Sequence, residues 1–149
     1  MNLLKIIKNY NKKLSWDEYF INLSFLVSKR SPCERLHVGC ILVKNFRVIS
    51  SGYNGFLSGA SHNSFIRNDH EQMVNHAEVN AICDCSKRGV NTNNAIAYIT
   101  HYPCLICFKI LVASGIKQIK FYDNYKNDKL VKKLANEINI IIEKLNSST

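Results

Sequence analysis

The chain has 149 residues, 46% of them hydrophobic, which is enough for one buried core and too little for several ordinary domains. Its formal charge of +9, from 20 Lys and Arg against 11 Asp and Glu, suits an anionic ligand such as a nucleotide phosphate or a nucleic acid, but the scattered basic residues favour a plain solvated surface. Residues 1–13 are apolar only in pairs separated by Lys5 and Lys8, which excludes a signal peptide or membrane span and predicts a cytoplasmic protein.

The first predicted element is a helix from Ser15 to about Lys29. Ser15 and Glu18 have the spacing of a capping box, in which each side chain bonds an amide at the start of a helix. The preceding residues, 1–14, are predicted to form an N-terminal extension, either a short amphipathic helix or a disordered segment. The helix should lay one apolar stripe against a sheet, made by Trp16, Phe20, Leu23 and Val27.

A predicted β-hairpin follows, with strands at 38–43 and 47–55 joined by a turn at Lys44 and Asn45. Residues 56–74 are polar and irregular in pattern. A second helix is predicted over 75–88 because helical spacing stops there at Gly89, a usual C-cap residue. The run AIAYIT at 95–100 predicts a third strand.

The last third of the chain predicts alternating helices and strands. A helix should begin at Pro103, which the first helical turn tolerates, and end at Ser114 and Gly115. The remaining elements are a strand at 116–122, a helix at 128–137 and a strand at 138–145. Such β-α-β units place neighbouring strands parallel. The whole order predicts a three-layer α/β/α domain over 15–149, with a mixed five-stranded sheet.

Two motifs carry the chemistry of the chain. His76-Ala77-Glu78 precedes a PCLIC run that begins 27 residues after His76 (103 − 76). Cys104 and Cys107 are three apart at a predicted helix start, so their sulfurs lie on one face. With His76 they supply three ligands, which is the number that leaves the fourth position of a catalytic zinc open for water.

Glu78 lies two residues beyond His76 and can reach the same cavity to shuttle protons without binding the metal. The pattern H-x-E with P-C-x-x-C is typical of zinc deaminases, for which it predicts hydrolysis at C4 of cytosine. A structural zinc site is the alternative, and its fourth ligand would come from Cys83, Cys85 or His101.

The cysteines outside the PCLIC run are predicted to be reduced thiols, with a second metal site as the other interpretation; they are Cys33, Cys40, Cys83 and Cys85.

With these residues in place, the sequence resembles the deoxycytidylate (dCMP) deaminase family of cytidine deaminase-like zinc enzymes. The likeness covers about residues 15–126, through SWDEYF, KRSPCERLHVGCILV, SGYNGF, VNHAEVNAI, YITHYPCLIC and SGIKQIKFY. The resemblance implies conversion of dCMP to dUMP and ammonia for thymidylate synthesis, and it leaves open whether dCTP is an additional substrate. It also implies one catalytic Zn²⁺ per chain.

The resemblance also implies roles for individual residues. The zinc ligands would be His76, Cys104 and Cys107, with Glu78 as general acid and base. Substrate binding would involve Asn54 at the deoxyribose, Arg30 and Tyr125 at the 5′-phosphate, and Ala77 and His101. Effector binding would involve Gly52, Tyr53 and Gly55. The residues alone leave other roles open, since Asn54 could form a turn, Arg30 could end a helix and Tyr125 could be a packed aromatic.

Assembly and regulation are implied by the resemblance too. Relatives are homo-oligomers, so a hexamer or a dimer is expected, and many respond to dCTP and to dTTP with Mg²⁺. Between residues 59 and 75 this chain has His62 and His70 but no Cys, which favours surface histidines and argues against an extra zinc and against effector control. Neither a membrane nor a nucleic-acid partner is expected.

Two rival functions remain at this stage. The positive charge and the shared zinc motif would fit a nucleic-acid editing deaminase, such as a tRNA adenosine deaminase. A non-catalytic zinc-fold regulatory protein would not need Glu78, so the presence of that residue argues against it.

Overall fold

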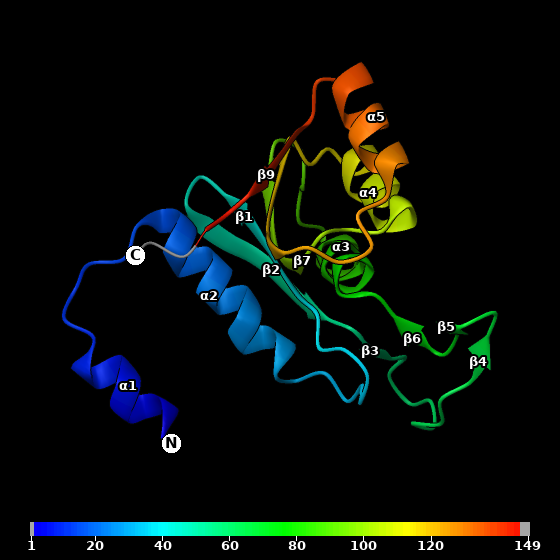
Figure 1. Ribbon diagram of the computed structural model, residues 1–149, viewed down its shortest axis with the longest axis horizontal. Coiled ribbons are helices and arrows are strands. Elements are labelled where there is room, and N and C mark those ends of the chain that lie inside the picture. The colour runs from blue at the N-terminus through cyan, green and yellow to red at the C-terminus, as the bar shows by residue number, and fades with distance from the viewer. Residues whose placement is uncertain (1, 147–149) are drawn as a thin grey trace.

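The computed structural model describes residues 2–146, which contain a five-stranded sheet with helices on both faces (Figure 1). The helices within this range are α1 (Leu3–Asn9), α2 (Trp16–Ser28), α3 (Ala77–Arg88), α4 (Leu105–Ala113) and α5 (Lys129–Glu137). The strands are β1 (Gly39–Lys44), β2 (Arg47–Tyr53), β3 (Gly55–Phe56), β4 (Ile66–Arg67), β5 (His70–Glu71), β6 (Val74–Asn75), β7 (Ile96–His101), β8 (Gln118–Asp123) and β9 (Ile141–Lys144).

The five main strands lie in the order β2-β1-β7-β8-β9. Strand β1 is antiparallel to both β2 and β7, whereas β8 is parallel to β7 and to β9. The hairpin and the two late β-α-β units therefore form as predicted. The mixed sheet and the three-layer α/β/α architecture are confirmed.

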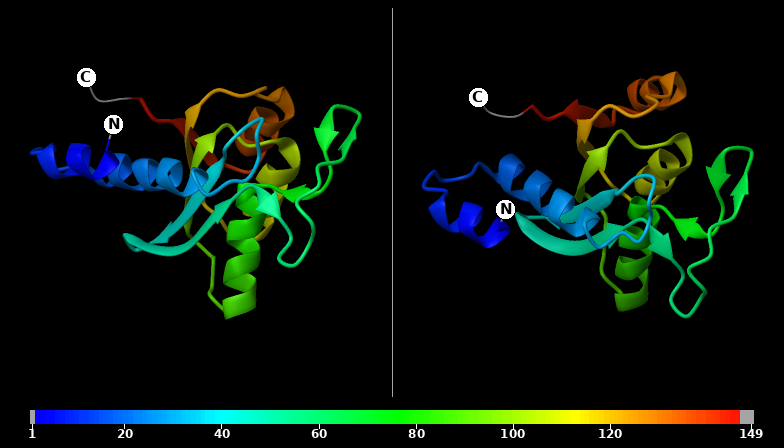
Figure 2. Two further views of the ribbon diagram at one scale, coloured as in Figure 1. Left: turned by 90° about the horizontal axis from the view of Figure 1, so that it is seen from below. Right: turned by 60° about the horizontal axis from the view of Figure 1, so that its bottom comes forward.

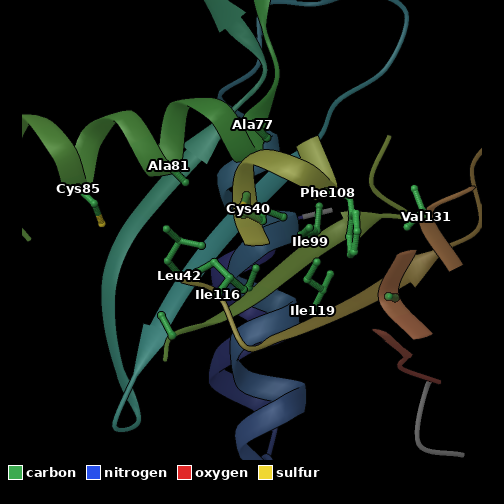
Figure 3. Packing of buried hydrophobic residues seen from close by; sticks show 14 residues of the cluster. Cys40, Leu42, Ala77, Ala81, Cys85, Ile99, Phe108, Ile116, Ile119 and Val131 are labelled. Carbon is green, nitrogen blue, oxygen red and sulfur yellow. The ribbon is translucent and has the colours of Figure 1, made fainter. Parts of the chain in front are cut away.

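Two hydrophobic clusters hold helices against the two faces of the sheet. Helix α2 covers one face, while α3, α4 and α5 cover the other (Figures 1 and 2). Figure 3 shows the cluster on the α3 side, with Ala81 and Phe108 near the β1 residue Leu42 and the β7 residue Ile99. Strand β1 is buried on both faces, because Leu42 packs in this cluster and Ile41 packs beneath α2. That double burial explains its unbroken apolar sequence.

Helix α2 begins with the predicted capping box. The Ser15 hydroxyl accepts from the Glu18 amide at 3.2 Å, and the Glu18 carboxylate accepts from the Ser15 amide at 2.7 Å. The predicted apolar stripe is only partly buried, because Trp16 is 54% exposed at the first turn. Its ring stacks on Phe20, which is buried and begins the contact with the sheet.

Helices α3 and α4 each begin two residues later than the sequence predicts. The predicted starts were Asn75 and Pro103, but His76 and Cys104 are extended N-cap residues with ψ of 154° and 162°. Helix α3 ends as predicted at Gly89, which has a left-handed φ of 65°. The predicted metal ligands therefore lie at the two helix entrances.

Residues 56–74 are more ordered than their polar sequence suggests. Strand β3 pairs with β6, and β4 pairs with β5 across a turn in which Asn68 and Asp69 have positive φ. The segment projects from the body of the molecule beside the start of α3 (Figures 1 and 2). Pairs of two residues are too short to leave an alternating pattern, so the sequence does not reveal them.

The N-terminal extension contains the short helix α1, one of its two predicted alternatives. Asn2 caps this helix, and each described residue from 2 to 13 is exposed. Helices within residues 2–146 are all too short or too polar to cross a membrane.

Candidate metal centre

Two helix entrances bring the His, Cys and Cys side chains of the motifs together. His76 caps α3, Cys104 caps α4, and Cys107 lies in the first turn of α4. The α3 entrance is held close to the sheet at Gly52 of β2, where an added Cβ would lie 2.3 Å from the Ala77 carbonyl oxygen. Strand β2 can approach α3 this closely only with glycine at that position.

The three ligand atoms have the spacing that one zinc ion requires. They lie within 4.8 Å of one another, with His76 Nδ1 at 3.6 Å from Cys104 Sγ and 3.2 Å from Cys107 Sγ. Tetrahedral zinc with ordinary bond lengths separates a nitrogen and a sulfur ligand by roughly 3.6 Å. One imidazole and two thiolates are also the donor types that zinc prefers, so these residues fit the ion.

The predicted candidates for a fourth protein ligand, Cys83, Cys85 and His101, are not members of the cluster in the described part of the chain. Within residues 2–146 the cluster has three members, His76, Cys104 and Cys107. Cys85 is buried in the core beneath α3, and Cys83 is exposed on the same helix. Three protein ligands are the arrangement of a catalytic zinc site rather than a structural one.

The environment of Cys104 favours the thiolate. Hydrogen bonding from Cys107, followed by that from His76, lowers the pKa of the Cys104 thiol to about 4 despite its partial burial. The Cys107 amide donates to the same sulfur at 3.3 Å. The interaction with Cys104 raises the pKa of the Cys107 thiol, and burial raises it further. The pair therefore favours one thiolate, and a bound cation would favour deprotonation of the second sulfur.

Glu78 places a carboxyl group beside the cluster without being one of its members. It lies in the first turn of α3 with only 4% of its surface exposed, and it lines the same cavity as His76 and Ala77. Burial raises the pKa of the Glu78 carboxyl, while backbone hydrogen bonding and the charge of His76 oppose that shift. A carboxyl group with a raised pKa can exchange protons near neutral pH.

A cavity of about 570 Å³ opens in front of these residues. Its walls come from the loop before β1, the projecting segment 56–74 and the ends of β7 and β8. This volume is in the range of small-molecule sites. Besides His76, the lining includes the basic side chains Arg35, His62, His70, His101 and Lys126.

Most of the predicted substrate-binding residues line this cavity. They are Asn54, Ala77, His101 and Tyr125. The Asn54 side chain also holds the neighbouring loop, because its Oδ1 accepts from the Val38 amide and its Nδ2 donates to the Leu36 carbonyl, both at 2.8 Å. Asn54 therefore has a structural role in this loop, and its role in ligand binding stays a prediction.

Arg30 is placed differently from its expected role. It is exposed in the turn after α2 and does not line the cavity, whereas Arg35 and Lys126 do. Neither of these two cations was predicted to bind substrate. The only sequence signal for Arg35 is its position inside the CERLHVG run that the family resemblance includes.

The three predicted effector residues have packing contacts outside the cavity lining. Gly52 packs on α3, the Tyr53 carbonyl accepts from Asn80 Nδ2 at 2.8 Å, and Gly55 pairs with Asn75. Their role in effector binding stays a prediction.

The remaining histidines and cysteines form no second cluster of metal ligands within residues 2–146. His62 is exposed and stacks on Phe56 at 4.8 Å between ring centroids, and His70 is exposed in β5. All six cysteines are free thiols.

Comparisons with known proteins agree with this geometry. ComE operon protein 2 of Bacillus subtilis (strain 168) is 38% identical over 138 residues, covering 90% of this chain and 73% of that protein. Deoxycytidylate deaminase of Schizosaccharomyces pombe is 37% identical over 126 residues, which are 76% of this chain but only 39% of that protein. The crystal structure of dCMP deaminase from cyanophage S-TIM5 in complex with dCMP and dUMP superposes with a TM-score of 0.79 at 27% identity, over 91% of this chain and all of that one.

The family comparison covers the whole centre. The model of the cytidine and deoxycytidylate deaminase zinc-binding region matches residues 14–123, a span that includes α2, β1, β2, both ligand motifs and β8. The chain therefore belongs to the zinc-dependent cytidine and deoxycytidylate deaminase family.

Proposed function

We propose that this protein catalyses the hydrolytic deamination of dCMP to dUMP and ammonia. The observation that carries the proposal is the buried Glu78 carboxyl beside the cluster of His76, Cys104 and Cys107, at the wall of a cavity of about 570 Å³. Folding does not require a carboxyl group at this position, and burying one without a function is unfavourable.

The proposed catalytic roles follow from the chemistry of the side chains at the site. His76, Cys104 and Cys107 would hold a zinc ion, which would lower the pKa of water at the site enough for it to act as nucleophile at neutral pH. The Glu78 carboxylate accepts a proton from the attacking water, delivers it to N3 of cytosine, and moves a second proton to the departing amino group. Addition of water at C4 and loss of ammonia from C4 leave uracil, so atoms and charges balance.

A 5′-nucleotide is the substrate class that the cavity supports. Arg35 and Lys126 are cations among its lining residues, and phosphate oxygens are acceptors that such cations bind. The phage structure that resembles this chain contains dCMP and dUMP, which supports the same substrate. The roles of Asn54, Ala77, His101 and Tyr125 in substrate binding are part of this proposal.

The test is ammonia release by the zinc-loaded protein from cytidine, CMP, dCMP and dCTP, each with and without added RNA. We expect dCMP to be turned over with the highest kcat/KM and RNA to have no effect. Absence of turnover with both dCMP and dCTP, despite bound zinc, would overturn the proposal. Activity that requires RNA would favour the nucleic-acid editing alternative instead.

Several further predictions accompany the proposed activity. They are a homo-oligomer, a cytoplasmic location and a domain that begins at residue 15, while acceptance of dCTP and regulation by dCTP or by dTTP with Mg²⁺ are left open by the sequence. The substrate panel tests dCTP directly. Repeating the dCMP assay with each triphosphate and Mg²⁺ tests regulation, and light scattering of the same sample tests assembly.

A further inference from the structure

A short chain of hydrogen bonds connects the edge of β1 with the cavity. The Gly39 amide donates to the Thr100 hydroxyl at 3.1 Å, and that hydroxyl lies 2.8 Å from His101 Nδ1. Regular pairing of β1 with β7 ends at Cys40 and Ile99, so the Thr100 side chain extends the contact by one residue. Thr100 is fully buried, whereas His101 lines the cavity.

The position of Gly39 in this chain is fixed by its packing. A Cβ added at Gly39 would lie 1.9 Å from the Ser24 carbonyl oxygen of α2, so the strand backbone is held directly against the helix. The Gly39 amide is consequently a rigid donor toward Thr100. The Gly39 amide can only donate, so it cannot accept the proton of the Thr100 hydroxyl. That proton needs a different acceptor.

Counting protons then fixes the state of His101. The Thr100 hydroxyl has one proton, and within residues 2–146 its hydrogen-bonding neighbours are the Gly39 amide and His101 Nδ1. If Nδ1 carried a proton and donated it, the buried hydroxyl proton would have no acceptor, which is unfavourable. The arrangement that satisfies both groups has Oγ1–H donating to Nδ1, which puts the proton of the neutral ring on Nε2.

The surroundings of His101 favour the neutral imidazole and leave Nε2 without a hydrogen-bond partner among the described residues. Burial lowers the pKa of the His101 imidazole, and the charge of Asp123 only partly offsets this effect. His101 Nε2 is 3.9 Å from Asp123 Oδ2, which is longer than a hydrogen bond, and the Tyr125 ring packs edge-on against the imidazole. His101 and Arg35 line both the main cavity and a smaller adjoining pocket.

We propose that Thr100 is a positioning residue that fixes His101 as the Nε2–H tautomer, so that His101 donates a hydrogen bond to the phosphate of the nucleotide. Phosphate oxygens accept hydrogen bonds and do not donate at neutral pH, so the opposite tautomer would turn a nitrogen lone pair toward them. The identity of the ligand rests on the proposed function. The tautomer rests only on the contacts of Gly39, Thr100 and His101.

The tautomer is measured by ¹⁵N NMR of imidazole-labelled, zinc-loaded protein, which distinguishes a protonated ring nitrogen from an unprotonated one. Comparison with a His101→Gln sample assigns the signals. We expect His101 to be protonated at Nε2 in the wild type and in Thr100→Ser, which keeps the hydroxyl. Thr100→Val, which keeps the shape and removes the hydroxyl, should lose this preference. A wild-type ring protonated at Nδ1 would overturn the proposal, even if the valine variant did not fold.

Ligand binding is tested on the same samples by adding inorganic phosphate and then dCMP. Both ligands should shift the His101 Nε2 signal of the wild type. With dCMP as substrate, the factor by which Thr100→Val raises KM should be about ten times the factor by which it lowers kcat. Thr100→Ser, which keeps the hydroxyl, should have the KM of the wild type. Equal KM values for the valine and serine variants, or a loss confined to kcat, would contradict the phosphate role. A correct tautomer in a protein that does not deaminate dCMP would count against the proposed function and not against the Thr100 assignment.

Discussion

Glu78 illustrates how burial and chemistry are coupled at a single residue. Its carboxyl group is 4% exposed, and burial raises its pKa, yet it lies next to a cluster that is suited to bind a cation. A bound ion would stabilise the carboxylate, while the apolar surroundings favour its protonated form. These two effects oppose each other, and a residue that shuttles protons must take up both protonation states.

Replacing Glu78 with Gln should separate metal binding from turnover. The amide has nearly the same shape but cannot carry protons, so we expect zinc content near one per chain and a fall in kcat of roughly 10²–10⁴. Atomic absorption and ammonia release measure the two quantities. Glu137→Gln, the same change at an exposed residue of α5, is the matched control and should leave both unchanged. Retained turnover in the Glu78 variant would contradict its role.

Tyr98 gives a prediction about alkaline pH. Burial, and secondarily the hydrogen bond that its hydroxyl donates to Asp17 at 2.7 Å, raise the pKa of the Tyr98 phenol above its ordinary 10.0. A raised folded-state pKa means that its contribution to stability is complete below pH 10 and is lost as the pH rises above that value. Tyr98→Phe should therefore reduce the loss of unfolding free energy above pH 10, measured by urea denaturation. The exposed-site variant Tyr10→Phe should retain the wild-type slope.

The residues of the metal centre could be predicted because spacing alone limits where they lie. Cys104 and Cys107 share a helix entrance, and the HAE motif places Glu78 in the first turn of α3. Arg35 and Lys126 could not be found in this way, since they belong to loops whose side facing the cavity is set by tertiary packing. Thr100 was hidden for another reason: its hydroxyl matters only through a contact with Gly39, which is 61 residues away.

At the level of elements, periodicity predicted helices and strands well where they pack on the sheet. Helix α2 and strands β1 and β7 have buried faces that leave a readable apolar pattern. The starts of α3 and α4 were misplaced by two residues, because extended backbone at an N-cap follows from local geometry and not from hydrophobicity. The two-residue pairs of segment 56–74 have almost no core contact to leave a pattern.

The contact between β2 and α3 can be tested at Gly52. An alanine Cβ there would meet the Ala77 carbonyl at 2.3 Å and the Ala81 amide at 2.6 Å, so α3 would have to move away from the sheet. We expect Gly52→Ala to destabilise the protein by about 1–3 kcal/mol and to lower its zinc content, because His76 begins that helix. Thermal unfolding and metal analysis measure these effects. Ser51→Ala on the exposed face of β2 is the control, and a fully stable Gly52 variant would show that the packing is not tight.

At the scale of the whole molecule, the two hydrophobic clusters make the five-stranded sheet a rigid support for the metal centre. Helix α3 follows β6 and helix α4 follows β7, and the two helices contact each other on the same face of the sheet. The late β-α-β units made the parallel pairing of β7, β8 and β9 predictable, since such crossovers leave few alternatives. The shape of the cavity was not predictable, because irregular loops form most of its wall.

The N-terminal extension should be dispensable for the fold. Each described residue from 2 to 13 is exposed, whereas Leu14 is half-buried. Deleting residues 2–13 should change the melting temperature by less than about 2 °C and leave kcat/KM for dCMP within twofold, because exposed segments contribute little to stability. Calorimetry and the ammonia assay provide the measurements. A larger drop in melting temperature would indicate that α1 packs on the domain or on a second copy.

The closeness of Cys104 and Cys107 also has a chemical cost. Two sulfurs one helical turn apart, one of them a ready thiolate and on an exposed residue, are well placed to react with an oxidant and join to each other. Shared coordination would shield both from that reaction. Protein depleted with a chelator in air should therefore recover activity on zinc addition only after treatment with a reductant, so the durability of this enzyme in storage depends on keeping its centre loaded.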